Sequence, residues 1–97
     1  MTVRYEWNAD KAAANLCKHR IGLADAIIAL RDPHRLETVD DRFAYGEERI
    51  QVIGSARRGI LFVVIVAPDE DTQRIISARK ATRHEQDHYY RRDDTSW

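Results

Sequence analysis

The chain has 97 residues, of which 43% are hydrophobic and 33% are charged. This length fits one domain with a single modest core, and the composition suits a folded, soluble chain rather than a disordered one. No apolar run approaches the ~18 residues of a membrane span, and the first ten residues lack the profile of a signal peptide. A single cysteine, Cys17, excludes an internal disulfide framework. We therefore expect one domain over residues 1–97 in a reducing cytoplasm, with 93–97 as a flexible tail.

The charges cancel overall but are unevenly distributed. Lys and Arg number 16, and so do Asp and Glu. Residues 20–48 contain four Arg against seven acidic residues, whereas residues 73–92 contain five Arg and one Lys against two acidic residues. Arginine dominates the cations, and its planar guanidinium pairs with phosphates and stacks on bases. A basic C-terminal third therefore favours RNA binding, although a solvated face with internal salt bridges would have the same composition.

The N-terminal residues predict a strand followed by a helix. Residues 3–7 (VRYEW) are rich in the β-branched and aromatic types that favour a short strand. Asn8 can cap a helix over the Ala-rich residues 9–20. Gly22 is expected to end that helix.

A second helix is predicted over residues 23–32, where Asp32-Pro33 ends it. Apolar residues recur at helical spacing and should form its buried stripe. They are Leu23, Ile27 and Leu30.

After the second helix the apolar period changes from 3.6 to 2, which predicts strands. The expected strands are 35–40 at an edge, 49–55, 60–67 at the centre because both its faces are apolar, and 73–81. Short turns at 56–59 and 68–72 join the last three strands into an antiparallel meander, and a final helix begins near residue 82. We expect an α+β domain with an antiparallel sheet of about five strands, two N-terminal helices on one face of the sheet and the C-terminal helix on the other.

Two patterns overlap in residues 79–90 (RKATRHEQDHYY). The first is a capping box, in which Thr82 and Glu85 satisfy each other's backbone N–H groups at a helix start. Arg83 then lies in the first helical turn, where the helix dipole disfavours a cation unless an anion binds there. The alternative is that Arg83 pairs with a nearby acidic side chain.

Arg79 ends the strand that precedes this helix. Strand alternation predicts that Ile76 and Ala78 face the helix-covered core and that Arg79 projects from the opposite, open face. Arg79 and Arg83 would then form a phosphate clamp.

The second pattern, HEQDH, matches the H-E-x-x-H motif of zinc peptidases, with His84 and His88 on one helix face. A zinc hydrolase also needs a third ligand and a substrate cleft. Only nine residues follow His88, and the chain is short for such an enzyme. We expect a surface helix with two histidines, and neither a metal nor another cofactor.

Several motifs together resemble the BrnT family of toxins from type II toxin–antitoxin systems. They are YEWNADKAAANLCKHRIGLADA near the start, DP at 32–33, GEERIQVIG at 46–54 and RIISARKATRHEQDHY at 74–89. The chain departs from the family pattern at Asn8, where Asp is usual, and at Arg20, where Gly is usual.

The resemblance implies a RelE-like ribonuclease fold and a metal-independent endoribonuclease that cleaves RNA and inhibits translation. It also implies a BrnA-like antitoxin with a ribbon-helix-helix domain, assembled with the toxin as a dimer of heterodimers. Operator DNA would be bound only through the antitoxin. Two alternatives stay open: a catalytically inactive module that binds the antitoxin in operon autoregulation, and the zinc hydrolase.

Metal-free RNA cleavage uses the 2′-OH as nucleophile and needs a base, an acid and cations that stabilise the phosphorane. The residues expected to supply these are Lys18, His19, Arg79 and Arg83. The residues expected to bind the substrate are Trp7, Arg49 and Lys80. Lys18 and His19 have another explanation, since cations are favoured at a helix C-terminus. Trp7 also has an alternative explanation, since a tryptophan at this position could simply pack in the hydrophobic core.

Overall fold

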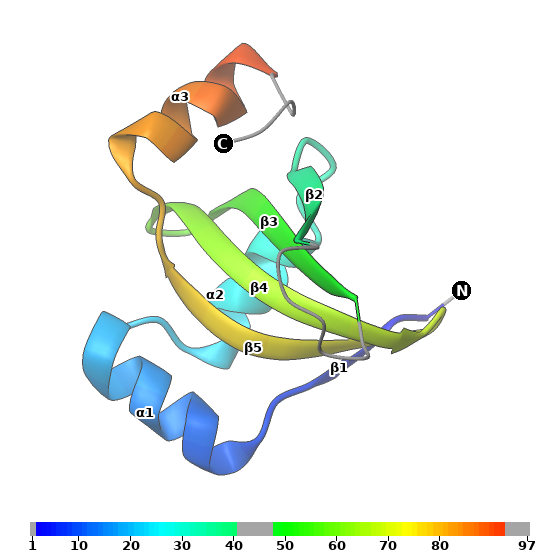
Figure 1. Ribbon diagram of the computed structural model, residues 1–97. Coiled ribbons are helices and arrows are strands. Elements are labelled where there is room, and N and C mark those ends of the chain that lie inside the picture. Colours follow the sequence, from blue (N-terminus) through cyan, green and yellow to red (C-terminus); the bar gives the residue numbers. More distant parts are fainter. Residues whose placement is uncertain (1, 41–47, 93–97) are drawn as a thin grey trace.

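The computed structural model describes residues 2–40 and 48–92, in which a five-stranded sheet carries three helices (Figure 1). In chain order the elements are β1 (Arg4–Glu6), α1 (Ala9–His19), α2 (Leu23–Leu30), β2 (Leu36–Asp40), β3 (Arg49–Ala56), β4 (Gly59–Asp69), β5 (Thr72–Lys80) and α3 (Arg83–Arg91). The predicted α+β class and element order are confirmed. The predicted tail at 93–97 lies outside the described residues. Within the described ranges, no helix has the length and apolar character to cross a membrane.

The sheet has the order β1-β5-β4-β3-β2. Strands β2 to β5 form the predicted antiparallel meander, with β4 inside the sheet and β2 at an edge. The expectation of a purely antiparallel sheet was wrong, because β1 pairs in parallel with β5. Parallel neighbours need a long crossover, and here the whole chain from α1 to β4 lies between them.

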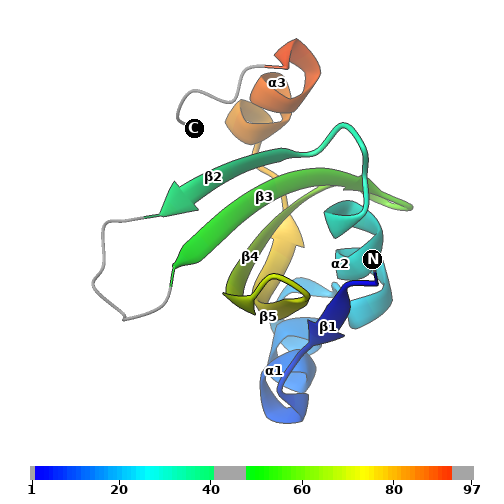
Figure 2. The same cartoon turned by 90° about the vertical axis from the view of Figure 1, so that its right-hand side faces the viewer.

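Helices α1 and α2 lie on one side of the sheet and α3 on the other (Figure 2). Helix α2 packs so closely on β3 that a Cβ at Gly54 would collide with the backbone carbonyl of Ala29. Small residues therefore form the contact, and Ala26 and Ala29 are fully buried. The predicted stripe was wrong in part, because Leu23 is 42% exposed.

The larger core lies between the sheet and α2, and Ile21 of the α1–α2 connection completes it. Its buried members are Ile21, Ala26, Ala29, Leu30, Val52, Leu61, Val63, Ile65, Ile75 and Ala78. Strand β5 reaches this core through a bulge, since Ser77 pairs with Val64 but Ile75 pairs with Ile65. The extra residue, Ile76, is only half-buried. The prediction that Ile76 faces the core was therefore wrong, and Ile75 takes that place.

A second core lies under α3. Its buried members are Leu36, Ile53, Ile60, Phe62, Ala81 and Tyr89. The Tyr89 hydroxyl donates a 2.5 Å hydrogen bond to Oδ2 of Asp32, which also accepts the backbone N–H of Ser55. Burial and this contact with Asp32 raise the pKa of Tyr89 to about 12. Burial opposes ionisation of Asp32, but the hydrogen bonds outweigh it and lower the pKa of Asp32. Asp32 thus ties α3 to the end of α2 and to β3.

Candidate functional site

The end of α1 and the outer edge of β5 enclose a shallow pocket of about 230 Å³. Its lining residues are Lys11, Ala14, Asn15, Lys18, His19, Ile76 and Ser77. Lys18 is exposed and His19 half-buried, both in the last turn of α1. The helix ends at His19, where Arg20 adopts a left-handed conformation with φ 61°, rather than at Gly22 as predicted. The two predicted catalytic residues of α1 therefore lie side by side against β5.

This pocket leads round the strand edge to the α3 side of the sheet. Ser77 pairs with Val64 and Arg79 pairs with Phe62. Both partners pack in the core under α3, so Ser77 and Arg79 share that face. Two residues along a strand span roughly 7 Å. The structure thus brings Lys18 and His19 to one end of a short polar path and Arg79 to the other.

Arg79 projects from the predicted face, but its guanidinium is engaged. Its Nη1 and Nη2 donate to the two carboxylate oxygens of Glu85 at 2.8 and 2.9 Å. The guanidinium lies 4.2 Å from the ring centroid of Phe62, a cation–π contact. About a third of the Arg79 side chain, 34%, stays exposed against 10% for Glu85. Arg79 is therefore an ion-pair partner with one accessible side.

Glu85 has two tasks at the start of α3. Its carboxylate accepts the backbone N–H of Thr82, whose hydroxyl accepts the backbone N–H of Glu85, so the predicted capping box is confirmed. Burial opposes ionisation of Glu85, but the hydrogen bonds from Arg79 and Thr82 outweigh it and lower the pKa of Glu85. The ionised carboxylate thus fixes the strand end and the helix start together.

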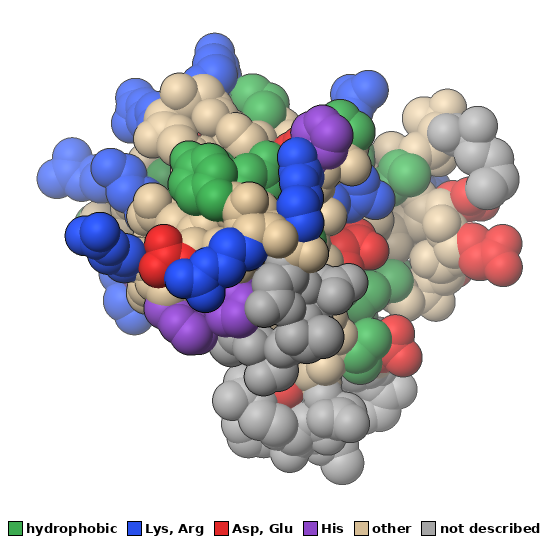
Figure 3. Space-filling view, turned by 90° about the horizontal axis from the view of Figure 1, so that it is seen from above, with side chains coloured by type: hydrophobic (Ala, Val, Ile, Leu, Met, Phe, Trp, Pro, Cys, Tyr) green, Lys and Arg blue, Asp and Glu red, His purple; other side chains and the backbone are tan. Residues whose placement is uncertain are grey.

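Lys and Arg side chains gather on the face that α3 presents, mainly at the left and top of the view in Figure 3. The backbone N–H of Ala81 donates to the carbonyl of Ile60, which keeps the start of α3 close to the β3–β4 turn. The exposed cations of α3 and of that turn are Arg58, Arg83, Arg91 and Arg92, whereas Arg57 reaches Asp25 of α2 at 3.7 Å. Lys80 is exposed too, but it pairs with Leu61 and so lies on the other side of the sheet.

Trp7 and Arg49 are not among the residues that line the pocket between α1 and β5. Trp7 is half-buried and packs against the larger core, which accounts for it without an RNA ligand. Arg49 pairs with Val66, four residues along β4 from the partner of Arg79. That spacing corresponds to about 13 Å along the strand. Only a long substrate could contact both ends of the sheet.

His84 and His88 contact each other through their Nε2 atoms at 3.2 Å. Such a contact is one hydrogen bond, with one ring as donor and the other as acceptor. Among residues 2–40 and 48–92, no group of three His, Cys, Asp or Glu side chains is placed to hold a metal ion. The HEQDH segment therefore gives no positive support to a zinc hydrolase, and metal independence stays a prediction.

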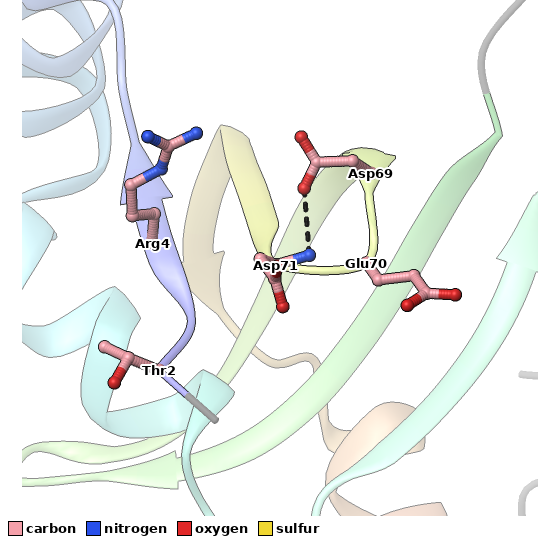
Figure 4. A pocket seen from close by; sticks show the side chains of 5 residues that line it. All are labelled: Thr2, Arg4, Asp69, Glu70 and Asp71. Carbon is pink, nitrogen blue, oxygen red and sulfur yellow. Dashed lines mark hydrogen bonds between the residues drawn. The ribbon is translucent and has the colours of Figure 1, made fainter.

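A second pocket, of about 640 Å³, lies at the opposite end of the sheet between β1 and the β4–β5 turn. Figure 4 shows Arg4 on β1 facing this turn, with Glu70 directed away from it. Asp69 accepts the backbone N–H of Asp71, and this hydrogen bond lowers the pKa of Asp69. Three acidic side chains around one arginine would repel a phosphate, so this pocket is a poor RNA site.

Sequence reasoning missed Asn15, Ser77 and the pairing of Arg79 with Glu85. Asn15 had a signal, because asparagine disfavours helix interiors and stands here within an Ala-rich helix. No local sequence pattern pointed to Ser77, since its position beside α1 depends on how the strand and the helix pack.

Comparison with known proteins bears on the family and the fold of this chain. Residues 7–85 match the family described as the ribonuclease toxin, BrnT, of type II toxin–antitoxin systems. No curated protein matches the chain in sequence. The 1.1 Å crystal structure of the Brucella abortus ribonuclease toxin BrnT matches with a TM-score of 0.61 and 24% identity, covering 84% of this chain and 100% of that one. At that identity the likeness shows the fold. The family match runs over most of the chain and includes α1 and β5, which line the pocket, and the chain therefore belongs to the BrnT family of ribonuclease toxins of type II toxin–antitoxin systems.

Proposed function

We propose that this toxin is a metal-independent endoribonuclease whose site lies between the end of α1 and the outer half of β5. The observation that carries the proposal is the pocket in which Lys18 and His19 meet Ser77, two residues before Arg79. The proposal takes His19 as the base, Lys18 and Arg79 as the cations, and the outer half of β5 as the route to a phosphate-binding face.

The proposed reaction is attack of a ribose 2′-oxygen on the adjacent phosphorus. His19 takes the proton of the 2′-OH, since an imidazole nitrogen can act as a general base. The P–O2′ bond forms, the P–O5′ bond breaks, and the leaving 5′-oxygen takes a proton from Lys18 or from water. Arg79 and Arg83 bind the phosphate oxygens, where the developing charge is largest. The products carry a 2′,3′-cyclic phosphate and a free 5′-OH.

The remaining predicted substrate contacts fit this site unequally. Lys80 follows Arg79 at the end of β5 and is exposed, so it can hold the backbone of the same RNA strand. Arg49 lies towards the other end of the sheet and would contact only a substrate that crosses it. Trp7 directly follows β1, whose last residue Glu6 pairs with Arg74 of β5, and it packs against the larger core. We therefore assign Arg49 and Trp7 to the outer part of the proposed binding surface.

The proposed partner is a BrnA-like antitoxin with a ribbon-helix-helix domain, in a dimer of heterodimers. The exposed cations around α3 favour an acidic or amphipathic antitoxin segment on that face. Such a segment would cover the route to Arg79 and so block RNA. The pair would act in the cytoplasm, where operator DNA is reached only through the antitoxin.

The test is RNA cleavage by the purified toxin in excess chelator, with and without purified antitoxin. Cleavage that persists in chelator and stops with antitoxin is the expected result. Loss of cleavage in chelator, restored by a divalent metal, would contradict metal independence. No cleavage under any condition, with tight antitoxin binding, would favour the inactive binding module.

A further inference from the structure

Asn15 is a buried polar residue whose contacts join α1 to β5. Its side chain is in the middle of α1, and the residue is 7% exposed. Its Nδ2 donates to the carbonyl oxygens of Ala78 at 2.8 Å and Ile21 at 3.1 Å. Its Oδ1 accepts the backbone N–H of Ala78 at 3.2 Å. One amide thus uses both its donors and its acceptor on backbone groups.

These contacts replace a missing strand. Strand β1 pairs with β5 only from Thr72 to Arg74, and no other described strand lies beside β5 on that edge. Ala78 directs its N–H and C=O to this edge, where the Asn15 amide meets both as a neighbouring peptide group would. The bulge at Ile76 lies between the end of the β1 pairing and this clamp. No described strand therefore pairs with this edge of β5 at the pocket, and the Asn15 amide bonds the edge just beyond it, at Ala78.

The clamp fixes the two halves of the proposed site relative to each other. Lys18 and His19 follow Asn15 by three and four residues, so they share its face of the helix. On the strand, Ser77 precedes the clamped Ala78 and Arg79 follows it. The third hydrogen bond, to Ile21, holds the chain just after the helix end. A shift of α1 along β5 would move His19 relative to Arg79.

We propose that Asn15 is a positioning residue for RNA cleavage, which sets the distance between the α1 cations and the phosphate-binding face of β5. This inference rests on the proposed endoribonuclease function. Asn15 touches no substrate in it and acts only through Lys18, His19 and Arg79. Misplacement of reacting groups by about 1 Å can cost a hundredfold in rate.

The decisive variant is Asn15→Asp, which keeps the shape. An ionised carboxylate still accepts the N–H of Ala78, but it repels the carbonyl oxygens of Ala78 and Ile21. A protonated carboxyl can donate to one of them. We expect kcat to fall about tenfold to a hundredfold at neutral pH with KM within about threefold. The ratio of variant to parent kcat should recover as the pH falls and the carboxyl becomes protonated.

Val52→Ala is the matched control, since Val52 is fully buried under α2 and away from α1. It should lower the melting temperature and keep kcat and its pH profile at temperatures below unfolding. Asn15→Ser, checked for folding, is a second test and should also lose kcat by about tenfold. A parent that cleaves RNA while both Asn15 variants keep its kcat at every pH would overturn the inference alone. A parent that cleaves no RNA would overturn the proposed function.

Discussion

The two regions that flank the outer half of β5 carry similar charges and use them differently. On the α3 side Arg79 is paired with Glu85, and Asp32 with Tyr89. On the α1 side Lys18 and His19 line a pocket and make no ion pair with any described residue. Folding accounts for the paired groups, whereas it gives the α1 cations only a favourable helix terminus. The α1 side therefore has the stronger claim to chemistry, and the α3 side combines support with substrate contact.

The largest expected effect is that of Arg79→Ala, because Arg79 both stabilises the fold through Glu85 and is proposed to bind the phosphate. Its removal leaves the Glu85 carboxylate without its bidentate partner, which should lower the free energy of unfolding by about 2 kcal/mol. In a chain of this size that corresponds to a fall of roughly 10 °C in melting temperature. Below that temperature RNA cleavage should still fall by roughly a hundredfold, because a phosphate contact is lost.

Glu85→Gln separates the two roles of this pair. It removes the ion pair and keeps Arg79, so stability should fall while much of the cleavage remains. Arg79→Lys should rescue cleavage only partly, since an ammonium cannot grip a phosphate bidentately. Full cleavage by folded Arg79→Ala would show that Arg79 is a structural residue only.

Lys18→Ala and His19→Ala should lower the rate of RNA cleavage strongly and change the stability of the fold very little. Each is expected to lower kcat by roughly a hundredfold, about 3 kcal/mol in the barrier, as for other acid–base and charge-stabilising groups. Stability should change by less than about 1 kcal/mol, because Lys18 is exposed, His19 is half-buried, and each gains only a favourable helix terminus. Lys11→Ala, in the same helix and pocket, is the control, and its kcat should fall less than that of the other two variants. Equal cleavage by parent and both variants would remove α1 from the site.

Arg83→Ala should have a smaller effect on rate and almost none on stability. Arg83 is exposed in the first turn of α3, where the helix dipole disfavours a cation. We expect cleavage to fall roughly tenfold, about 1.4 kcal/mol, and the melting temperature to stay level or rise slightly. Arg91→Ala, at the other end of the same helix, is the comparison. A melting temperature well below that of the parent would instead reveal an ion pair.

The two sides also differ in how far the sequence predicts them. Local signals were sufficient for the capping box at Thr82 and Glu85, for the Asn8 cap, and for the order of the strands after Pro33. Each of these depends on residues within a few positions of one another. The motifs in turn were sufficient to identify the family.

Contacts distant in sequence could not be predicted in the same way. The parallel pairing of β1 with β5 joins Arg4 to Thr72, and the β5 bulge exchanges Ile76 for Ile75 in the core. A one-residue slip in a strand moves every later side chain to the other face, so alternation alone fails at a bulge. The close approach of α2 to Gly54 changed the expected stripe in part, since backbone contact selects Ala26 and Ala29 over Leu23 while Leu30 stays buried.

The Asp32–Tyr89 hydrogen bond predicts an effect on stability alone. Tyr89→Phe should lower the free energy of unfolding by about 1.5 kcal/mol at neutral pH, because the acceptor is ionised. The folded state lowers the pKa of Asp32, so this stability is present above its unfolded pKa of about 3.9 and is lost as the pH falls through the folded value. The difference between Tyr89→Phe and the parent should therefore shrink below about pH 4 in denaturant titrations. A constant difference down to pH 2 would contradict the assigned pairing.

The smallest expected effect is that of the histidines that first suggested zinc. His84 and His88 bond to each other, and His88 is 9% exposed while His84 is exposed. Loss of one neutral hydrogen bond costs about 1 kcal/mol. We expect His84→Ala to leave RNA cleavage within about threefold of the parent, because no step of the proposed reaction uses it. His88→Ala should lose somewhat more stability, because it removes a buried ring. For both histidine variants, the rate of RNA cleavage should be the same in chelator as in added zinc. The opposite outcome is stoichiometric zinc in the purified toxin that is lost together with cleavage on chelation and is absent from both variants. That result would place the catalytic site on α3 and leave the α1 side without a catalytic role.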